Sequence, residues 1–348
     1  MAKHIPFCLY HYPKSHQVGL AVQENYLPHN KSLSFLIVPF HHSSTTNTQK
    51  LFVVNNEALN NHYLQFIESC TPLSYNETAY LPQETTKEQY VQSFQTYTEL
   101  MHSGKINKAI LSRVIHKKIP ENFDIITYYQ TLKNAYPNAF VYLSAHPQYG
   151  IWMGASPELL LKKNNQQISI VALAGTQKLH DAEKYTWRTK EQEEHRMVVN
   201  YIEDVFKKNH IELIEKGAMK TVIAGQVAHL KTEFIFKDNP TVSIEKLLHN
   251  LHPTPAVGGL PKKESIDCIQ QFEGYDRAYY TGYIGMTDFD KQADFYVNLR
   301  CMQITKNTIA IYVGGGITAS SNAEEEWTET TLKSNTLLKY FYSKKIND

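Results

Sequence analysis

Apolar side chains at three- and four-residue intervals predict three long helices in this chain. The first covers residues 87–103; Thr86 ahead of it and Gln89 in its first turn have the spacing of a capping box. The same periodicity predicts helices over residues 191–207 and 324–340.

Shorter stretches alternate between apolar and polar residues or are continuously apolar, which is typical of strands. The pattern predicts a turn at Asn164-Asn165 and a surface loop at residues 41–48. Hairpins interrupted by helices, without regular strand–helix alternation, favour an α+β fold with a mostly antiparallel sheet. The predicted strands are residues 34–38, 107–115, 140–144, 159–161, 168–173, 295–304 and 309–313.

The composition permits a large core but does not divide the chain. With 348 residues, 42% of them hydrophobic, the chain suits one large domain or two ordinary ones. The 23 tyrosines and many β-branched residues favour strands. Because no linker or repeat is visible, we expect one integrated core over residues 86–342, with residues 1–85 as a β-rich layer packed on it.

Charge and cysteine spacing exclude several classes of protein. The net charge is +1 with no basic block, which argues against nucleic acid and membrane-surface partners. Cys8, Cys70, Cys268 and Cys301 lie far apart, as expected for reduced thiols rather than a disulfide framework or a zinc site. No signal-like or membrane-spanning apolar run is present, so we expect a cytoplasmic protein. Without a large apolar stripe, we expect a monomer.

Two neighbouring segments near the C-terminus predict a ligand site. In a helix, Glu326, Glu329 and Lys333 fall on one stripe that continues into Leu337, so they point inward. Buried carboxylates beside an ammonium are costly unless they hold something. The preceding Gly314-Gly315-Gly316 lets backbone N–H groups approach an anion closely. Together these residues predict one wall of a site for an anionic small molecule and a hard cation.

Four charged residues could add to this site, although each has an ordinary explanation. Glu194 shares the apolar stripe of its helix, where it is either a helix-entry glutamate or a metal ligand. Lys108 is an exposed edge lysine or an inward one, and Glu158 is a loop-end carboxylate or a site residue. Arg300 within an apolar strand needs an anion, either a ligand or an internal partner. An all-carboxylate shell favours Mg²⁺ over zinc.

Two loops have open interpretations as well. His252-Pro253-Thr254-Pro255-Ala256 is a rigid connection whose simplest role is structural. Gly175-Thr176 ends a predicted strand, where it forms an ordinary turn or offers a backbone N–H and a hydroxyl to a ligand.

Taken in order, these segments resemble the chorismate-utilising enzymes, which include isochorismate, salicylate, anthranilate and aminodeoxychorismate synthases. The resemblance covers about residues 86 to 342, and an ordered set of this size overturns the ordinary explanations above. The matching segments are Lys108-Ala109-Ile110-Leu111-Ser112-Arg113, Ser156-Pro157-Glu158, Leu173-Ala174-Gly175-Thr176, Glu194-His195, His252-Pro253-Thr254-Pro255-Ala256, Tyr280-Thr281-Gly282, Leu299-Arg300, Gly314-Gly315-Gly316 and Glu326-Trp327-Thr328-Glu329.

Within that family the chain is most similar to the isochorismate synthases. The aminating, anthranilate-type members typically have glutamine where this chain has Lys108, and aminodeoxychorismate synthases usually have lysine where it has Ala174. The loop ending in Ala256 has the form found in isochorismate synthases, whereas salicylate synthases differ there but share Lys108 and Glu158.

The resemblance implies an enzyme that converts chorismate reversibly to isochorismate with Mg²⁺. Lys108 is then the general base that activates water for attack at C2, and Glu158 is the general acid on the departing C4 hydroxyl. Glu194 and Glu329 hold Mg²⁺, with Glu326 bound directly or through water. The alternatives are a salicylate synthase, which also eliminates pyruvate, and a non-catalytic chorismate-binding protein. The implied substrate-binding residues are Gly175, Thr176, His252, Ala256, Tyr280, Arg300, Gly314, Gly315, Gly316 and Lys333.

Overall fold

The computed structural model describes residues 6–23, 29–41, 47–54, 81–164, 166–178, 185–224 and 227–342. Most of the predicted loop at residues 41–48 lies outside these ranges, as do Asn165 of the predicted turn and Cys70. The other three cysteines are buried free thiols. Within the described part, no helix has the length and apolar character needed to cross a membrane.

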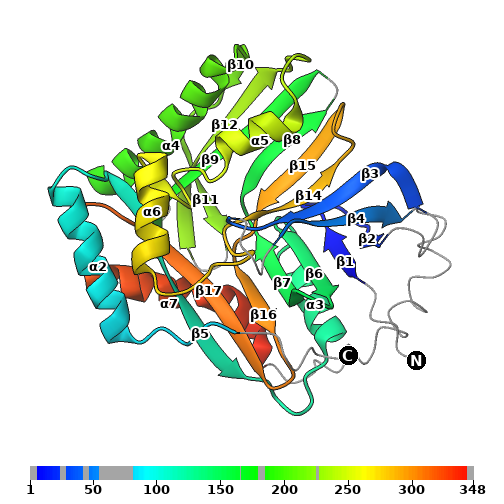
Figure 1. Ribbon diagram of the computed structural model, residues 1–348, viewed down its shortest axis with the longest axis horizontal. Coiled ribbons are helices and arrows are strands. Elements are labelled where there is room, and N and C mark those ends of the chain that lie inside the picture. Colours follow the sequence, from blue (N-terminus) through cyan, green and yellow to red (C-terminus); the bar gives the residue numbers. More distant parts are fainter. Residues whose placement is uncertain are drawn as a thin grey trace.

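The strands form one continuous antiparallel path that folds back on itself as a sandwich (Figure 1). The first half runs through β13 (Gly259–Leu260), β5 (Lys108–Lys118), β17 (Thr308–Ile317), β16 (Cys301–Ile304), β7 (Gly150–Ser156), β6 (Phe140–His146) and β1 (Phe7–His11). The second half continues through β2 (Gly19–Val22), β4 (Gln49–Val54), β3 (His29–Val38), β14 (Tyr283–Thr287), β15 (Gln292–Val297), β8 (Leu159–Asn164), β9 (Gln167–Lys178) and β12 (Val227–Lys237), which pairs with both β10 (Leu213–Lys216) and β11 (Lys220–Ala224).

The N-terminal strands lie in the middle of this path. Strand β1 pairs with β6 of the first half, and β3 pairs with β14 of the second. The described N-terminal strands therefore connect the two halves by hydrogen bonds.

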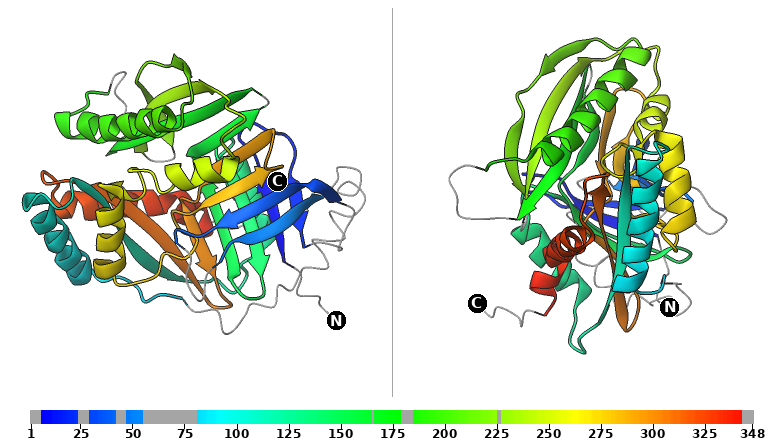
Figure 2. Two further views of the ribbon diagram at one scale, coloured as in Figure 1. Left: turned by 45° about the horizontal axis from the view of Figure 1, so that its top comes forward. Right: turned by 90° about the vertical axis from the view of Figure 1, so that its left-hand side faces the viewer.

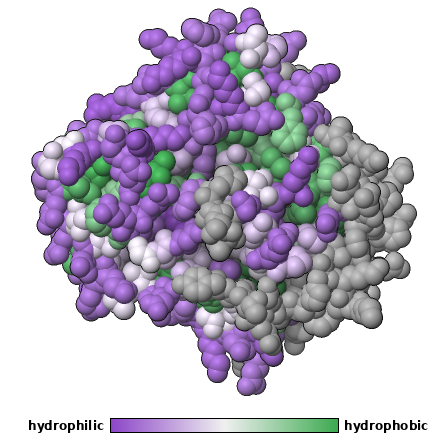
Figure 3. All heavy atoms as spheres, viewed as in Figure 1, coloured by the Kyte–Doolittle hydropathy of each residue, from purple (hydrophilic) through white to green (hydrophobic). Residues whose placement is uncertain are grey.

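Helices cover the outer faces of the sandwich (Figures 1 and 2). Each helix has buried residues along one side. The three long helices confirm the predicted ones to within two residues, and Thr86 and Gln89 form the predicted capping box. Hydrophilic residues cover most of the described part of the face in Figure 3. The helices are α2 (Lys87–His102), α3 (Ile125–Ala135), α4 (Thr189–Lys208), α5 (Ile244–Leu251), α6 (Lys262–Phe272) and α7 (Ala323–Phe341).

Aromatic rings fill the space between the two halves, which explains the tyrosine-rich composition. Tyr312 of β17 stacks on Trp152 of β7 with ring centroids 5.2 Å apart, and on Tyr280 at 5.6 Å. Phe140 of β6 stacks on Tyr296 of β15 at 4.8 Å, so the contact joins strands from opposite halves. Such stacked pairs add to the stabilisation that comes from burying the rings.

The prediction of one strand over residues 295–304 is wrong, because the chain changes sheet partners there. Strand β15 pairs with β8 and β14, whereas β16 pairs with β7 and β17. The amide of Asn298 accepts from the Tyr142 hydroxyl and donates to the Tyr279 carbonyl, and Arg300 has a φ of 49°. Arg300 is therefore in the left-handed region between two strands, not inside one, and this kink lies beside the candidate site.

Candidate active site

Lys108 begins β5 and points inward. Its side chain is 0% exposed, and its Nζ lies 3.0 Å from Oε1 of Glu194 on α4. A methyl group on Gly316, which pairs with Ile110 across β17 and β5, would lie 3.1 Å from the Lys108 Cε. The exposed-edge explanation for Lys108 is therefore wrong, and the ammonium lies between a helix carboxylate and a glycine backbone.

Glu158 occupies the turn between β7 and β8 and is also buried. Its backbone carbonyl accepts from Val297 N–H at 3.0 Å, which fixes the turn against β15. Burial raises the pKa of the Glu158 carboxyl to about 8, while the charge of Lys108, then Lys333 and Arg300, opposes that rise. Glu158 is thus largely protonated at neutral pH, as a general acid requires.

Three carboxylates approach the glycine strand from two helices. A methyl group on Gly315 would lie 2.7 Å from Oε2 of Glu326 and 3.6 Å from Oε1 of Glu329, and one on Gly316 would clash with Oε1 of Glu194. A side chain at Gly315 or Gly316 would therefore displace the carboxylate of Glu326 or Glu194. Burial, with repulsion from Glu329 and Glu194, raises the pKa of Glu326.

Each of these carboxylates is paired with a lysine. Besides the Lys108–Glu194 pair, Lys190 lies 2.7 Å from Glu326 and Lys333 lies 2.6 Å from Glu329. In the described part of the chain, no set of three or more His, Cys, Asp or Glu residues has the spacing of an assembled metal site. The donors are nevertheless all carboxylate oxygens that converge on one pair of glycines, which is the ligand chemistry of a hard cation such as Mg²⁺.

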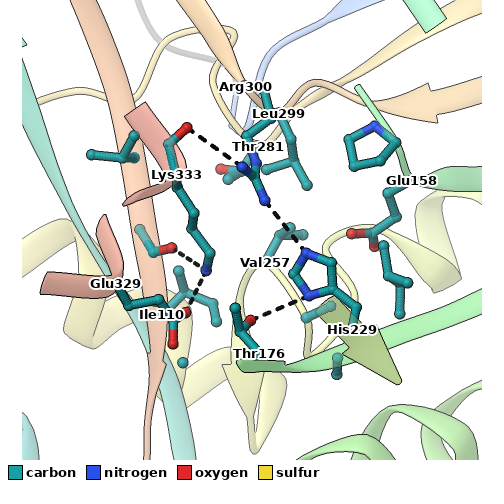
Figure 4. A pocket seen from close by; sticks show the side chains of 18 of the residues that line it. Ile110, Glu158, Thr176, His229, Val257, Thr281, Leu299, Arg300, Glu329 and Lys333 are labelled. Carbon is teal, nitrogen blue, oxygen red and sulfur yellow. Dashed lines mark hydrogen bonds and ion pairs between the residues drawn. The ribbon is translucent and has the colours of Figure 1, made fainter. Parts of the chain in front are cut away.

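Arg300 brings a buried positive charge to the cavity (Figure 4). It is 8% exposed and donates to the Thr336 hydroxyl at 2.9 Å and to the Lys333 carbonyl at 3.4 Å. Among the described residues, no carboxylate lies within ion-pair distance of it. A buried guanidinium with unused donors is a site for an anion.

His229 of β12 closes the space between Arg300 and Glu158 (Figure 4). Burial, followed by the charges of Arg300 and Lys333, lowers the pKa of His229 to about 3, so the ring is neutral. Its Nδ1 lies 3.0 Å from the Gly175 carbonyl and therefore carries the proton, which leaves Nε2 to accept from Arg300 at 3.4 Å.

Most of the predicted site residues line this one cavity. Lys108 and Glu326 are exceptions that lie directly behind its wall. Lys108 contacts Glu194, and Glu326 lies beside Gly315. The predicted residues that line it are Glu158, Gly175, Thr176, Glu194, Ala256, Tyr280, Arg300, Gly314, Gly315, Gly316, Glu329 and Lys333.

His252 is the one predicted binding residue that lies elsewhere. Its ring packs edge-on against Tyr283, with centroids 5.0 Å apart, and against Phe40 at 6.3 Å. Among the described residues, His252 is not one of those that line the cavity. Burial lowers the pKa of its ring to about 3. Within the loop, Ala256 and Val257 reach the cavity, whereas His252 anchors the loop from behind.

Several residues that line the cavity were not predicted from the sequence. Strand β12 was not predicted, although Leu230, Thr232, Phe234 and Phe236 alternate in a way that could have found it. His229 precedes a register shift at Leu230, so no simple periodicity assigns it to the cavity. The other missed lining residues are Ile110, Pro157, Leu173, Ala174, Val257, Thr281, Leu299, Tyr312 and Val313.

Comparison with known proteins agrees with this fold and shows the family. The model of the chorismate binding enzyme family matches residues 13–342, so the chain belongs to that family. The isochorismate synthase EntC of Escherichia coli is 28% identical over 277 residues, which cover 77% of this chain and 70% of EntC.

Two solved structures share the fold. DhbC from Bacillus anthracis superimposes with a TM-score of 0.77 at 22% identity, covering 97% of this chain and 96% of DhbC. MenF, the menaquinone-specific isochorismate synthase from Escherichia coli, superimposes with a TM-score of 0.74 at 20% identity, covering 96% and 88%. The predicted fold class, a large antiparallel sandwich wrapped by helices, is confirmed.

Proposed function

We propose that this chain is an isochorismate synthase that converts chorismate reversibly to isochorismate with Mg²⁺. Family membership and the similarity to EntC support the substrate and the reaction class. The observation that carries the proposal is the position of two buried groups beside one cavity, with Glu158 in its lining and Lys108 directly behind its wall. Glu158 has a raised pKa and keeps its proton, and the charge of Lys108 is the largest of those that oppose this rise.

In the reaction, Lys108 takes a proton from water as the water oxygen bonds to C2 of the ring. The ring double bonds shift, and the bond from C4 to its hydroxyl oxygen breaks. Glu158 gives its proton to that oxygen, which leaves as water. One water is consumed and one is released, so the product is an isomer of the substrate, and the reverse reaction exchanges the two proton roles.

The two carboxylates of chorismate match the two charged ends of the cavity. Arg300 provides a guanidinium with free donors for the enolpyruvyl carboxylate, beside the Tyr280 hydroxyl and the backbone of Gly314-Gly315-Gly316. Gly175, Thr176, Ala256 and Lys333 complete the walls around the ring.

Glu194 and Glu329 would hold Mg²⁺ beside the ring carboxylate, with Glu326 bound directly or through water. These carboxylates would thereby place a cation that would stabilise the negative charge developing on this carboxylate as the double bonds shift. The convergence of the three carboxylates on Gly315 and Gly316 supports this assignment.

Incubation of the purified protein with chorismate and Mg²⁺, followed by chromatography of the products, tests the proposal. We expect isochorismate in equilibrium with chorismate, formation of chorismate from added isochorismate, and no release of pyruvate. Salicylate with stoichiometric pyruvate would instead identify a salicylate synthase. Binding of chorismate without any product would contradict an enzymatic role.

A further inference from the structure

A second pair of buried charges, Glu273 and Arg277, lies behind the cavity and takes no part in the proposed chemistry. Both residues are in the irregular segment that joins α6 to β14, and they are 6% and 1% exposed. Arg277 Nη2 lies 2.7 Å and Nε 2.5 Å from the two oxygens of Glu273. The guanidinium carbon also lies 4.7 Å from the centre of the Phe40 ring, so the pair is sealed from water.

All five N–H donors of Arg277 are used. Besides the two bonds to Glu273, Arg277 donates to the carbonyl of Ile110 at 2.8 Å, the carbonyl of Val257 at 2.9 Å and the hydroxyl of Thr281 at 3.2 Å. Because a guanidinium is planar and rigid, five bonds fix the relative positions of the groups that accept them.

The three partners beyond Glu273 come from separate segments and all line the substrate cavity. Ile110 is two residues from Lys108 on β5, Val257 follows Ala256, and Thr281 follows Tyr280. Glu273 adds a fourth connection, since its Oε1 accepts from the backbone N–H of Ser112 at 2.7 Å. Ser112 pairs with Gly314 across β5 and β17.

We propose that the Glu273–Arg277 pair is a positioning unit that sets the shape of the substrate cavity from outside. It holds the strand that carries Lys108, the loop that carries Ala256 and the turn that carries Tyr280 at fixed separations. Neither residue touches the substrate. This role rests on the proposed function, since it concerns the geometry of that active site.

Replacing a buried ion pair with well-packed apolar residues of similar volume is often neutral or stabilising for the fold. Stability alone therefore does not account for a guanidinium whose partners are three cavity-lining groups. A positioning role does, because small displacements of binding groups cost much activity: about 1 Å can cost about 10²-fold in rate.

The test begins with turnover of chorismate by the unmodified chain, whose absence would refute the proposed function without bearing on the geometry. If turnover is present, Arg277→Lys is the first variant. It keeps the charge beside Glu273 but offers three donors in place of five. Kinetics are measured at least about 15 °C below the melting temperature of each variant, so that every sample is folded.

Lys163→Gln is the matched control. Lys163 of β8 forms a buried pair with Asp238 at 2.9 Å, and neither residue lines the cavity. We expect Arg277→Lys to raise KM for chorismate about 10-fold and lower kcat about 10-fold. We expect Lys163→Gln to keep both KM and kcat within twofold of the unmodified chain, even if its melting temperature falls as much as that of Arg277→Lys. Equal kinetic losses in both variants, or none in Arg277→Lys, would overturn the proposal.

The double variant Glu273→Leu/Arg277→Met gives a second, independent test. It replaces the charges with apolar groups of similar size and removes the bonds to the cavity walls. We expect a folded protein by circular dichroism with kcat/KM reduced about 10²-fold. A folded double variant with unchanged kcat/KM would refute the positioning role. If the double variant does not fold, Arg277→Lys and its control still decide the question.

Discussion

Two buried arginines lie beside the same cavity, but they differ in how many of their N–H donors bind other protein groups. This difference distinguishes an arginine that supports the fold from one that can bind a ligand. Arg277 is paired with Glu273 and uses all five donors within the protein. Arg300 has no carboxylate within ion-pair distance among the described residues, and its one short bond goes to the Thr336 hydroxyl. Glu158 is also buried beside this cavity, and burial raises the pKa of its carboxyl to about 8, so that it keeps its proton.

Buried charge is costly unless it is paired, so unmatched groups indicate what the fold is built to bind. Substitutions of the unpaired groups at the cavity should therefore impair catalysis or substrate binding and leave the stability of the fold nearly unchanged. Substitutions at the Glu273–Arg277 pair should affect both.

The largest effect is expected from Lys108→Ala. Loss of the base should reduce isochorismate formation about 10³- to 10⁴-fold, because general-base catalysis typically contributes this much. Binding of chorismate and Mg²⁺ should remain close to that of the unmodified chain in calorimetric titrations. Near-normal turnover in this variant would refute the base assignment.

Glu158→Gln should reduce kcat about 10²- to 10³-fold and remove one limb of the pH profile. The unmodified chain needs Glu158 protonated, so its kcat/KM should fall as pH rises above about 8. In the folded chain the Glu158 carboxyl keeps a proton that it loses in the unfolded chain above about pH 4.5. The contribution of Glu158 to the free energy of unfolding therefore falls as pH rises from 4.5 to 8.

Glu158→Gln should therefore raise the melting temperature, and by more at pH 8 than at pH 5. Scanning calorimetry at these two values measures the difference. A lower melting temperature at pH 8, or an unchanged basic limb in the variant, would show that Glu158 is not the buried acid.

Arg300→Met compared with Arg277→Met tests the two arginines directly. The first should raise KM for chorismate about 10²-fold, because it removes a charged partner of the substrate, and should leave unfolding by urea nearly unchanged. The second should lower the free energy of unfolding by about 3–5 kcal/mol, because Glu273 loses its partner. Equal destabilisation by the two substitutions would remove the distinction between them.

The smallest effect is expected from Glu194→Gln, in the apparent affinity for Mg²⁺. Removing one of the proposed carboxylate ligands should weaken it by at least about 10-fold, whereas saturating Mg²⁺ restores part of the activity. Titration of activity and of binding heat against Mg²⁺ measures the shift. Glu193→Gln, an exposed neighbour on the same helix, is the control. Identical Mg²⁺ curves for both variants would exclude Glu194 as a ligand.

The sequence predicted those parts of the fold that depend on local periodicity. The capping box at Thr86 and the apolar stripes of α4 and α7 are local, and these helices lie where they were expected. The short helices α3, α5 and α6 were not predicted, because eight to eleven residues give little periodicity.

The candidate site could be predicted from the order of its sequence motifs. Local periodicity and charge patterns contributed less to this prediction. The left-handed conformation of Arg300 is rare for a residue with a side chain, so its segment was predicted as a continuous strand. The role of Arg277 could not be predicted either, because it depends on carbonyl groups of residues 20 and 167 positions away.

The account depends on water, not the departing hydroxyl, supplying the new C2 oxygen. The most direct measurement is turnover of chorismate in ¹⁸O-enriched water with Mg²⁺, followed by mass spectrometry of the isochorismate formed. We predict one ¹⁸O at C2 of the product, and almost none formed by the Lys108→Ala variant in the same time. Isochorismate without the label would mean that the hydroxyl migrates within the substrate, and would contradict the roles given to Lys108 and Glu158.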